Sequence, residues 1–453
     1  MAKVLLQKNR KRRLEAGHPW IFQSEVLEIQ GEYQPGDLVE VANHQGHFLA
    51  QGYINPASQI IVRILSYNPT EAIDQVFFTR RIREAMEFRT RFVDNPQACR
   101  VVYGEADFLP GLIVDRYNDV LVAQILSRGM ENRLELIKQA LIDVFQPKGI
   151  FLRNDVPVRE LEGLEQTKGV LYGECPREVE IVENGLTYIV DIVEGQKTGF
   201  FYDQRENRAA VAPLMRGWGE KHGITLQPLG TDGEPLWDRT GKLRDGVEPL
   251  LDDAQQPVTK PVDKRGKIVK NPYWDGAEVL ECFTHTGSFT MNACKHGAKK
   301  VTALDISEHA IETAKRNITL NGFLHRVDFV VANAFDYLRE SVEANRSWDV
   351  VILDPPAFAK SKAAVKGAVR GYKDINLHGM KLVRPGGFLV TASCSYHMSP
   401  ELFHETIMEA AYDAKKILRL IEWRGAGKDH PEISGTQEAH YLKFAIYEVR
   451  DRK

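Results

Sequence analysis

The sequence predicts an α/β protein in which a small β-barrel and an α+β segment precede a larger domain built on a parallel sheet. Short β-type runs separated by turn residues fill residues 1–70, and mixed helical and strand patterns follow in residues 71–190. Apolar strands then alternate with amphipathic helices through residues 191–453. This alternation indicates a parallel sheet, whose ligands bind beyond the carboxyl ends of its strands. These three segments are the predicted domains.

The composition excludes several classes of protein. Hydrophobic residues make up 43% and charged residues 27% of the 453 residues, and the net charge is -3, which rules out a wholly disordered chain and a uniformly basic one. No apolar run approaches the roughly 18 residues of a membrane span, and the charged start lacks the apolar core of a secretory signal. The 5 cysteines are scattered without a CxxC pair, which argues against a disulfide framework and a metal site. We therefore expect a cytoplasmic protein without a metal and without a membrane partner.

The first segment combines positive charge with barrel-type strands. Strands are predicted at residues 37–41, 47–53 and 59–65, a spacing typical of a small barrel. Cationic side chains gather before the first acid of the chain: Lys3, Lys8, Arg10, Lys11, Arg12 and Arg13. Such a strip favours contact with nucleic-acid phosphates, and a solvated arm is the simpler alternative. Trp20, in the segment 17–22 (GHPWIF), is either a core residue or a platform for base stacking.

The central segment shows no recognisable catalytic constellation. Residues 73–92 carry apolar side chains at helical spacing among many arginines, which predicts an exposed basic helix. A second amphipathic helix is expected at 132–145, and strands are expected at 108–117, 120–126, 149–153 and 179–193. We interpret this segment as a connecting domain, or one that cradles RNA.

The last segment supplies the parallel sheet. Strands are predicted at 279–283, 301–305, 329–332, 350–354, 388–394, 417–424 and 441–449. Helices are predicted at 288–296, 308–321, 375–382 and 400–414. The two final strands are expected to form an antiparallel hairpin at the sheet edge. Residues 219–275 are rich in Gly, Pro and Asp, and we interpret them as a disordered or loosely packed insertion, although Trp237 and Trp274 argue for some packing.

Two strand ends predict a site for an adenosine group. The first apolar strand runs into the turn 284–287 (THTG) and a helix, and a glycine there lets the backbone approach a ligand. The next strand ends in Asp305, a place from which a carboxylate accepts both hydroxyls of a ribose. These features alone do not separate a nicotinamide cofactor from S-adenosylmethionine.

Two further strand ends carry reactive groups. The fourth strand ends in Asp354, Pro355 and Pro356, and the prolines stiffen a turn that presents carbonyl groups and one carboxylate to a planar ligand. The fifth strand ends in Cys394. A cysteine in a buried strand is usually a packing residue, but this position beside Asp354 favours a function. Cys282 and Cys294 are interpreted as packing residues.

These motifs resemble those of class I S-adenosylmethionine-dependent methyltransferases. More closely, the chain outside the insertion resembles bacterial 23S rRNA cytosine-C5 methyltransferases, which join an N-terminal PUA RNA-binding barrel, an α+β central domain and a Rossmann-like domain. The matching stretches are 17–22, 155–174, 195–208, the glycine turn, Asp305, 354–360 and 393–395. The resemblance implies S-adenosyl-L-methionine as cofactor, 23S rRNA or a large-subunit precursor as partner, and methyl transfer to C5 of a cytosine.

The resemblance also implies roles for individual residues. Cys394 is the nucleophile and Asp354 is catalytic. We expect contacts to RNA from Pro355, Pro356 and Phe358 of the Asp354 motif, and from Lys11, Arg12, Arg13 and Trp20 of the cationic N-terminal segment. Cofactor binding falls to Lys197, Thr198, Phe200, Asp203, Arg205, Phe283, Thr284, Gly287, Asp305, Ile306, Asn333, Ala334 and Asp354. The chain departs from the family at Asn333, where an Asp is usual, at Ser288, where many members have a second Gly, and in the insertion.

The implied chemistry leaves alternatives open. A thiolate that adds to C6 of cytosine makes C5 nucleophilic, and the base must first leave its stack. No second cysteine occurs in the segment 354–357 (DPPA), so the acceptor of the C5 proton is not identified, with His397 and the loop 429–431 as candidates. A uracil-C5 enzyme, an exocyclic-N methyltransferase that needs no cysteine, and a non-catalytic RNA-binding assembly factor are the alternatives. The sequence also allows a homodimer paired through the first two domains.

Overall fold

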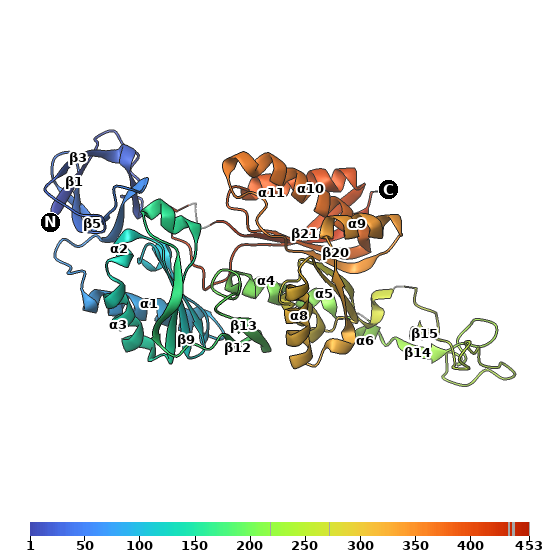
Figure 1. The fold of residues 1–453 in the computed structure, drawn as a ribbon. Coiled ribbons are helices and arrows are strands. Elements are labelled where there is room, and N and C mark those ends of the chain that lie inside the picture. The colour runs from blue at the N-terminus through green and yellow to red at the C-terminus, as the bar shows by residue number, and fades with distance from the viewer. Residues whose placement is uncertain (218, 271, 434, 437–439, 453) are drawn as a thin grey trace. The chain divides into compact units, whose positions relative to one another are not determined.

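The computed structural model describes residues 1–217, 219–270, 272–433, 435–436 and 440–452. They form two compact units, the first made of Met1–Asn207 with Gly425–Leu442 and the second of Arg208–Arg424 with Lys443–Lys453. Figure 1 shows the elements of both units. Among the described helices, none has both the length and the apolar character that a membrane crossing requires.

The first unit begins with a six-stranded sheet that folds around a small apolar core. Its strand order is β2-β6-β5-β4-β1-β3. The strands are β1 (Ala2–Leu6), β2 (Trp20–Phe22), β3 (Val26–Gln30), β4 (Leu38–Ala42), β5 (Phe48–Ile54) and β6 (Ile60–Ser66). β1 pairs antiparallel with β3 and parallel with β4. Val4, Val39 and Val62 are among the side chains in this core. The apolar residues that alternate along the short strands therefore face the inside of this sheet.

A second sheet of the first unit is accompanied by three helices. Its order is β11-β10-β9-β8-β7, and only β9 and β10 are parallel in it. The strands are β7 (Ala98–Tyr103), β8 (Leu112–Tyr117), β9 (Val120–Ile125), β10 (Gly149–Asn154) and β11 (Thr167–Gly173). The helices are α1 (Gln75–Phe92), α2 (Arg128–Glu131) and α3 (Leu134–Phe145), and a separate hairpin joins β12 (Glu178–Glu183) to β13 (Leu186–Asp191).

The expectation that α1 is an exposed basic helix is wrong for one of its arginines. Arg83 is exposed, but Arg89 is fully buried. The Arg89 guanidinium forms an ion pair with Asp107, in which Nη2 donates to Oδ2 at 2.7 Å. A buried guanidinium needs such a partner, and Asp107 lies too far along the sequence for helical spacing to reveal the pair.

The second unit is a twisted seven-stranded sheet with helices on both faces. Its order is β18-β17-β16-β19-β20-β22-β21. The strands are β16 (Glu278–Cys282), β17 (Lys300–Asp305), β18 (Val327–Val331), β19 (Trp348–Leu353), β20 (Val383–Ser393), β21 (Lys416–Arg424) and β22 (Lys443–Asp451). The first five are parallel, whereas β22 runs antiparallel to β20 and to the edge strand β21, which confirms the predicted hairpin.

The helices of the second unit cover the sheet. They are α4 (Arg205–Ala210, which begins in the first unit), α5 (Ala212–Met215), α6 (Gly219–His222), α7 (Ser288–Lys295), α8 (Glu308–Leu320), α9 (Ala334–Glu343), α10 (Val365–Leu382) and α11 (Pro400–Asp413). Figure 1 shows α9, α10 and α11 on one face and α8 on the other. Leu280, Val351 and Leu389 of three neighbouring strands lie in the core under α10 and α11.

The predicted insertion has regular structure. β14 (Thr225–Pro228) pairs antiparallel with β15 (Thr259–Val262), and the segment projects from the sheet of the second unit (Figure 1). Between and beyond these strands the chain makes tight turns of one kind. In each, the Oδ1 of Asp238, Asp252 or Asp263 accepts two backbone N–H groups, two and four residues further on. The Asp and Gly residues that suggested disorder therefore build repeated turns.

Candidate functional site

Four predicted elements of the site meet at one edge of the second unit's sheet. The strands β17, β16, β19 and β20 are adjacent and parallel. Their register aligns Cys282 with Leu304 on one side and with Leu353 on the other, and Leu353 with Thr391. The residues that follow these strands, or end them, are Phe283, Asp305, Asp354 and Cys394. The strand ends therefore bring the predicted cofactor and catalytic residues to the same edge.

The loop after β16 has an unusual backbone. Phe283, His285 and Gly287 have φ angles of 68°, 49° and 80°. A left-handed conformation costs a non-glycine residue about 1 kcal/mol or more, and such strain is concentrated at functional sites. At Gly287 an added Cβ would lie 3.1 Å from Cβ of Ala314, so glycine also lets the loop rest on α8. The loop is thus a fixed cradle of backbone groups above β16.

A buried carboxyl group supports this loop and was not singled out from the sequence. Glu281 is 1% exposed, and its Oε2 accepts from the hydroxyls of Thr284, at 2.8 Å, and Thr290. Burial raises the pKa of Glu281 to about 7, although the two threonine bonds lower it. The sequence signal that could have identified Glu281 is its place as an acidic residue inside the apolar run 279–283.

The Asp305 carboxylate is held in place by two backbone N–H groups. Oδ2 accepts from the N–H of His285 and Oδ1 from the N–H of Ser307, both at 3.0 Å. A carboxylate has about four acceptor positions, so two remain for hydroxyl groups of a ligand. The neighbouring Ile306 side chain is 69% exposed, which offers an apolar surface beside the carboxylate.

Asn333 caps a helix that the sequence did not predict. Its Oδ1 accepts from the N–H of Phe335 at 2.9 Å, at the start of α9, and Ala334 behind it is buried. Asn and Asp are equally good N-caps, so the departure from the family at this position keeps the local fold.

The Asp354 loop and Cys394 are in contact. The Sγ of Cys394 donates to the carbonyl of Pro355 at 3.8 Å, and Cys394 is partly exposed. Ser395 joins the two segments from behind, because its Oγ accepts from the N–H of Ala359 at 3.0 Å and lies 2.9 Å from the hydroxyl of Tyr372. Phe358 packs on Tyr372 with ring centroids 4.7 Å apart. Pro355 is buried and Pro356 exposed.

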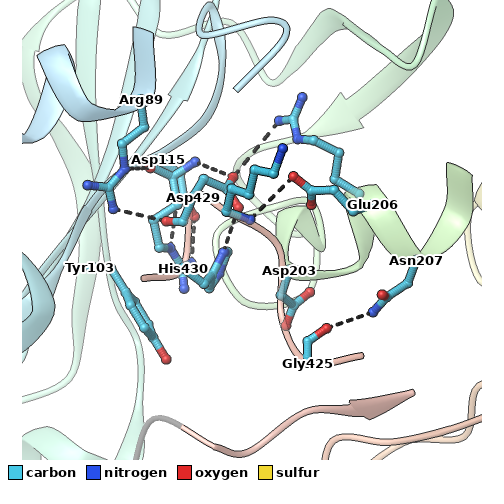
Figure 2. A network of polar contacts seen from close by, with 12 residues as sticks. Arg89, Tyr103, Asp115, Asp203, Glu206, Asn207, Gly425, Asp429 and His430 are labelled. Carbon is cyan, nitrogen blue, oxygen red and sulfur yellow. Dashed lines mark hydrogen bonds and ion pairs between the residues drawn. The ribbon is translucent and has the colours of Figure 1, made fainter. Parts of the chain in front are cut away.

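The predicted cofactor residues before position 206 belong to the first unit. Figure 2 shows the polar network there, which includes Asp203. Asp203 accepts from Nζ of Lys197 at 3.0 Å and from the hydroxyl of Tyr441 at 2.6 Å. Burial alone would raise the pKa of Asp203, but the Lys197 charge and these hydrogen bonds hold it well below its usual range. Thr198 donates to Asp115, and Phe200 is buried against Tyr188.

Arg205 and the loop 425–442 complete this network. Arg205 forms ion pairs with Glu183 at 3.8 Å and with Asp429 at 3.9 Å. Asp429 accepts from the N–H of Arg100 at 3.0 Å, and its carbonyl accepts from Arg89 at 2.9 Å. His430, a candidate proton acceptor, is buried beside Asp429 with Nδ1 2.8 Å from Oδ1. Through these contacts, Asp429 and His430 take part in the packing of the first unit (Figure 2).

The predicted RNA-contacting residues of the N-terminal segment also lie in the first unit. Lys11 and Arg12 are exposed, and the Arg13 guanidinium lies over the ring of Phe22, 5.1 Å from its centroid. Trp20 is half-buried, and its Nε1 donates to Oε1 of Glu105 at 2.8 Å. The indole of Trp20 therefore ties the N-terminal sheet to the segment that follows β7.

Comparisons with known proteins define the class of this fold. Residues 4–67 match the family model of the PUA-like domain, and residues 266–411 match the model described as conserved hypothetical protein 95. A Streptococcus mutans structure, described as a SAM-dependent methyltransferase, covers 99% of this chain and 100% of its own with a TM-score of 0.72 at 17% identity. A second, of a methyltransferase complexed with SAH, gives a TM-score of 0.73 with the same coverage and identity. The chain has the Rossmann-like fold of class I methyltransferases behind a PUA-like domain, as predicted.

The family follows from relatives of nearly equal extent. The ribosomal RNA large subunit methyltransferase I of Alteromonas mediterranea is 36% identical over 453 residues, which is 99% of both chains. The protein of the same name from Aliivibrio fischeri is 38% identical over 444 residues, 97% of both chains. The chain belongs to the ribosomal RNA large subunit methyltransferase I family. These names confirm the large-subunit rRNA part of the predicted resemblance and do not state the modified base.

Proposed function

We propose that this protein transfers a methyl group from S-adenosylmethionine to C5 of a cytosine in 23S rRNA, with Cys394 as a covalent nucleophile. The observation that supports this most directly is the contact of the Cys394 thiol with the carbonyl of Pro355, 3.8 Å away, beside Asp354. A partly exposed thiol at a strand end, next to a stiff turn that presents a carboxylate, is suited to attack a planar base. An rRNA substrate also implies action in the cytoplasm.

The residues at this sheet edge fit the proposed cofactor. The Asp305 carboxylate, oriented by two N–H groups, would take the ribose hydroxyls, and the exposed Ile306 side chain would pack on the adenine. The strained loop of Phe283, Thr284 and Gly287 would line the rest of the binding site with backbone groups. Asn333 and Ala334 would border the adenine. When bound, S-adenosylmethionine supplies an electrophilic methyl group on a sulfonium.

Cys394 and Asp354 would then act on the base in successive steps. The thiolate of Cys394 would bond to C6 as the C5–C6 double bond opens. C5 would then take the methyl group as the bond from that methyl to the sulfonium sulfur breaks and the sulfur keeps the electron pair. Asp354 would hold the N3 and N4 edge, and the Pro355 and Pro356 carbonyls would accept from the exocyclic amine. Loss of the C5 proton to a base and cleavage of the C6–S bond restore the double bond and release Cys394. Phe358 would line the base pocket through its packing on Tyr372.

The first unit would hold the RNA and the remaining predicted groups. Exposed Lys11 and Arg12 would neutralise phosphates, with Arg13 and Trp20 nearby in the same segment. Five residues stay proposed neighbours of the cofactor: Lys197, Thr198, Phe200, Asp203 and Arg205. Their contacts within the first unit also support a structural role, the packing of that unit.

A trapping experiment tests the covalent mechanism. Large-subunit rRNA transcripts that contain 5-fluorocytidine are mixed with S-adenosylmethionine and the protein, and a denaturation-resistant adduct is sought by gel shift. Fluorine at C5 cannot leave as a proton does, so the C6 thioether should accumulate. We expect an adduct with the wild type and with Cys175→Ala, which removes the other partly exposed cysteine, and none with Cys394→Ala.

Two outcomes would contradict the proposal. An adduct with Cys394→Ala would show that another group is the nucleophile. Methyl transfer without any 5-fluorocytidine adduct would exclude covalent catalysis on cytosine, and an adduct with 5-fluorouridine instead would identify a uracil-C5 enzyme.

A further inference from the structure

A buried lysine, Lys443, contacts both of the residues that flank Cys394. Lys443 begins β22 and is 1% exposed. In the antiparallel ladder its backbone pairs with Ser393, the residue before Cys394. Its Nζ donates to the carbonyl of Ser395, the residue after Cys394, at 2.7 Å. Lys443 thus contacts the chain on both sides of the proposed nucleophile.

The electrostatics of this corner couple the ammonium group to the thiol. Burial lowers the pKa of Lys443 to about 8, and the charge of Cys394 acts in the opposite direction. Two other titratable groups reach this strand end: Asp354 from the loop after β19 and Tyr372 from α10. Burial raises the pKa of Tyr372, and the charge of Cys394 raises it further, so this hydroxyl stays protonated.

We propose that Lys443 is a positioning residue that holds Cys394 as a thiolate through the charge of its buried ammonium group. The inference rests on the proposed role of Cys394 and adds to it the group that activates the thiol. In the activating step the S–H bond of Cys394 breaks, its proton passes to water at the partly exposed thiol, and the negative sulfur is stabilised by the Lys443 ammonium. Thiolates are the reactive form of cysteine, and a neighbouring cation favours them.

The test measures the thiol without RNA or cofactor. The intact protein is alkylated with iodoacetamide from about pH 6 to about pH 10, and modification of Cys394 is followed by peptide mass spectrometry. Lys443→Met removes the charge and the donor, Lys443→Gln removes the charge but keeps a donor, and Lys443→Arg keeps both. Lys416→Met is the matched control, because Lys416 pairs with Asp451 at the other end of β22, roughly 27 Å along the strand.

We expect the midpoint of Cys394 alkylation to move up by about one pH unit in Lys443→Met and Lys443→Gln, with alkylation about tenfold slower at neutral pH. Lys443→Arg and Lys416→Met should keep the wild-type profile. An unchanged profile in Lys443→Gln, in protein with a wild-type thermal transition, would overturn the inference and leave Lys443 a packing residue. The proposed function fails separately, if Cys394→Ala retains methyl transfer.

Discussion

Neutralising Glu281 should stabilise the second unit at alkaline pH. The carboxyl is buried in the middle of the sheet, and its pKa is raised from 4.5 to about 7 by burial. The folded protein therefore keeps a proton on Glu281 between these values, whereas the unfolded chain has lost it. Because the folded state then binds more protons, stability falls as the pH rises from about 4.5 to about 7. At 1.36 kcal/mol per pH unit the loss is about 3 kcal/mol, and it is complete above pH 7.

The variant Glu281→Gln removes this dependence with little change of shape. Its amide oxygen can still accept from Thr284 and Thr290, and it carries no charge at any pH. We expect wild type and variant to be equally stable near pH 4.5, and the variant to be more stable by about 3 kcal/mol at pH 8. Urea titrations at both pH values, read by hydrogen exchange of the β16 peptide, measure this difference.

A control on the same strand sharpens the result. Glu278, also on β16, is partly exposed and paired with Arg384 at 2.6 Å. Glu278→Gln should give no gain at pH 8. If Glu281→Gln is no more stable than the wild type at pH 8, burial does not raise the pKa of Glu281 in the folded protein, and the reasoning is refuted.

Two further variants test the other unit and the cofactor site. Arg89→Met should lower the free energy of unfolding by about 3 to 5 kcal/mol, because it leaves the buried Asp107 charge unpaired. The control is Arg83→Met on the same helix, which should change the free energy of unfolding little because Arg83 is exposed. A loss below about 1 kcal/mol for Arg89→Met would refute the pairing argument. Asp305→Asn should weaken S-adenosylmethionine binding in calorimetry by about tenfold, since one hydrogen bond to a charged acceptor contributes about 1.5 to 3 kcal/mol. Asp328→Asn, on the exposed face of β18, should bind as the wild type does, and equal affinities for all three proteins would exclude Asp305 from the site.

Much of the second unit could be predicted because its strands and helices alternate with clear periods. Helix α9 was missed, since Asn333 and Ala334 were assigned only to ligand binding although Asn333 is the N-cap of that helix. Helix α10 begins at Val365, ten residues before the predicted start, and Gly367 and Gly371 within this stretch lower its helical propensity. Burial of Ala368 and Tyr372 against the sheet overrides that propensity.

Part of the candidate site could also be predicted from the alternation of strands and helices. Asp305, Asp354 and Cys394 follow or end apolar strands, and parallel strands place such positions at one edge. Lys443 could not be found in this way, because its place beside Cys394 depends on the antiparallel register of β20 and β22. Sequence spacing carries no information on that register when nearly 50 residues separate the two.

The division of the chain into units restricts how the protein can be dissected. The loop 425–442 belongs to the first unit, although the strands before and after it belong to the second. Expression of residues 1–207 alone would omit Asp429, which accepts from the backbone of Arg100 and the side chain of Arg89. A protease cut in that loop would likewise sever β21 from β22 in sequence. Domain swaps between relatives should therefore exchange the N-terminal segment together with this loop, because neither unit is encoded by one uninterrupted stretch of the gene.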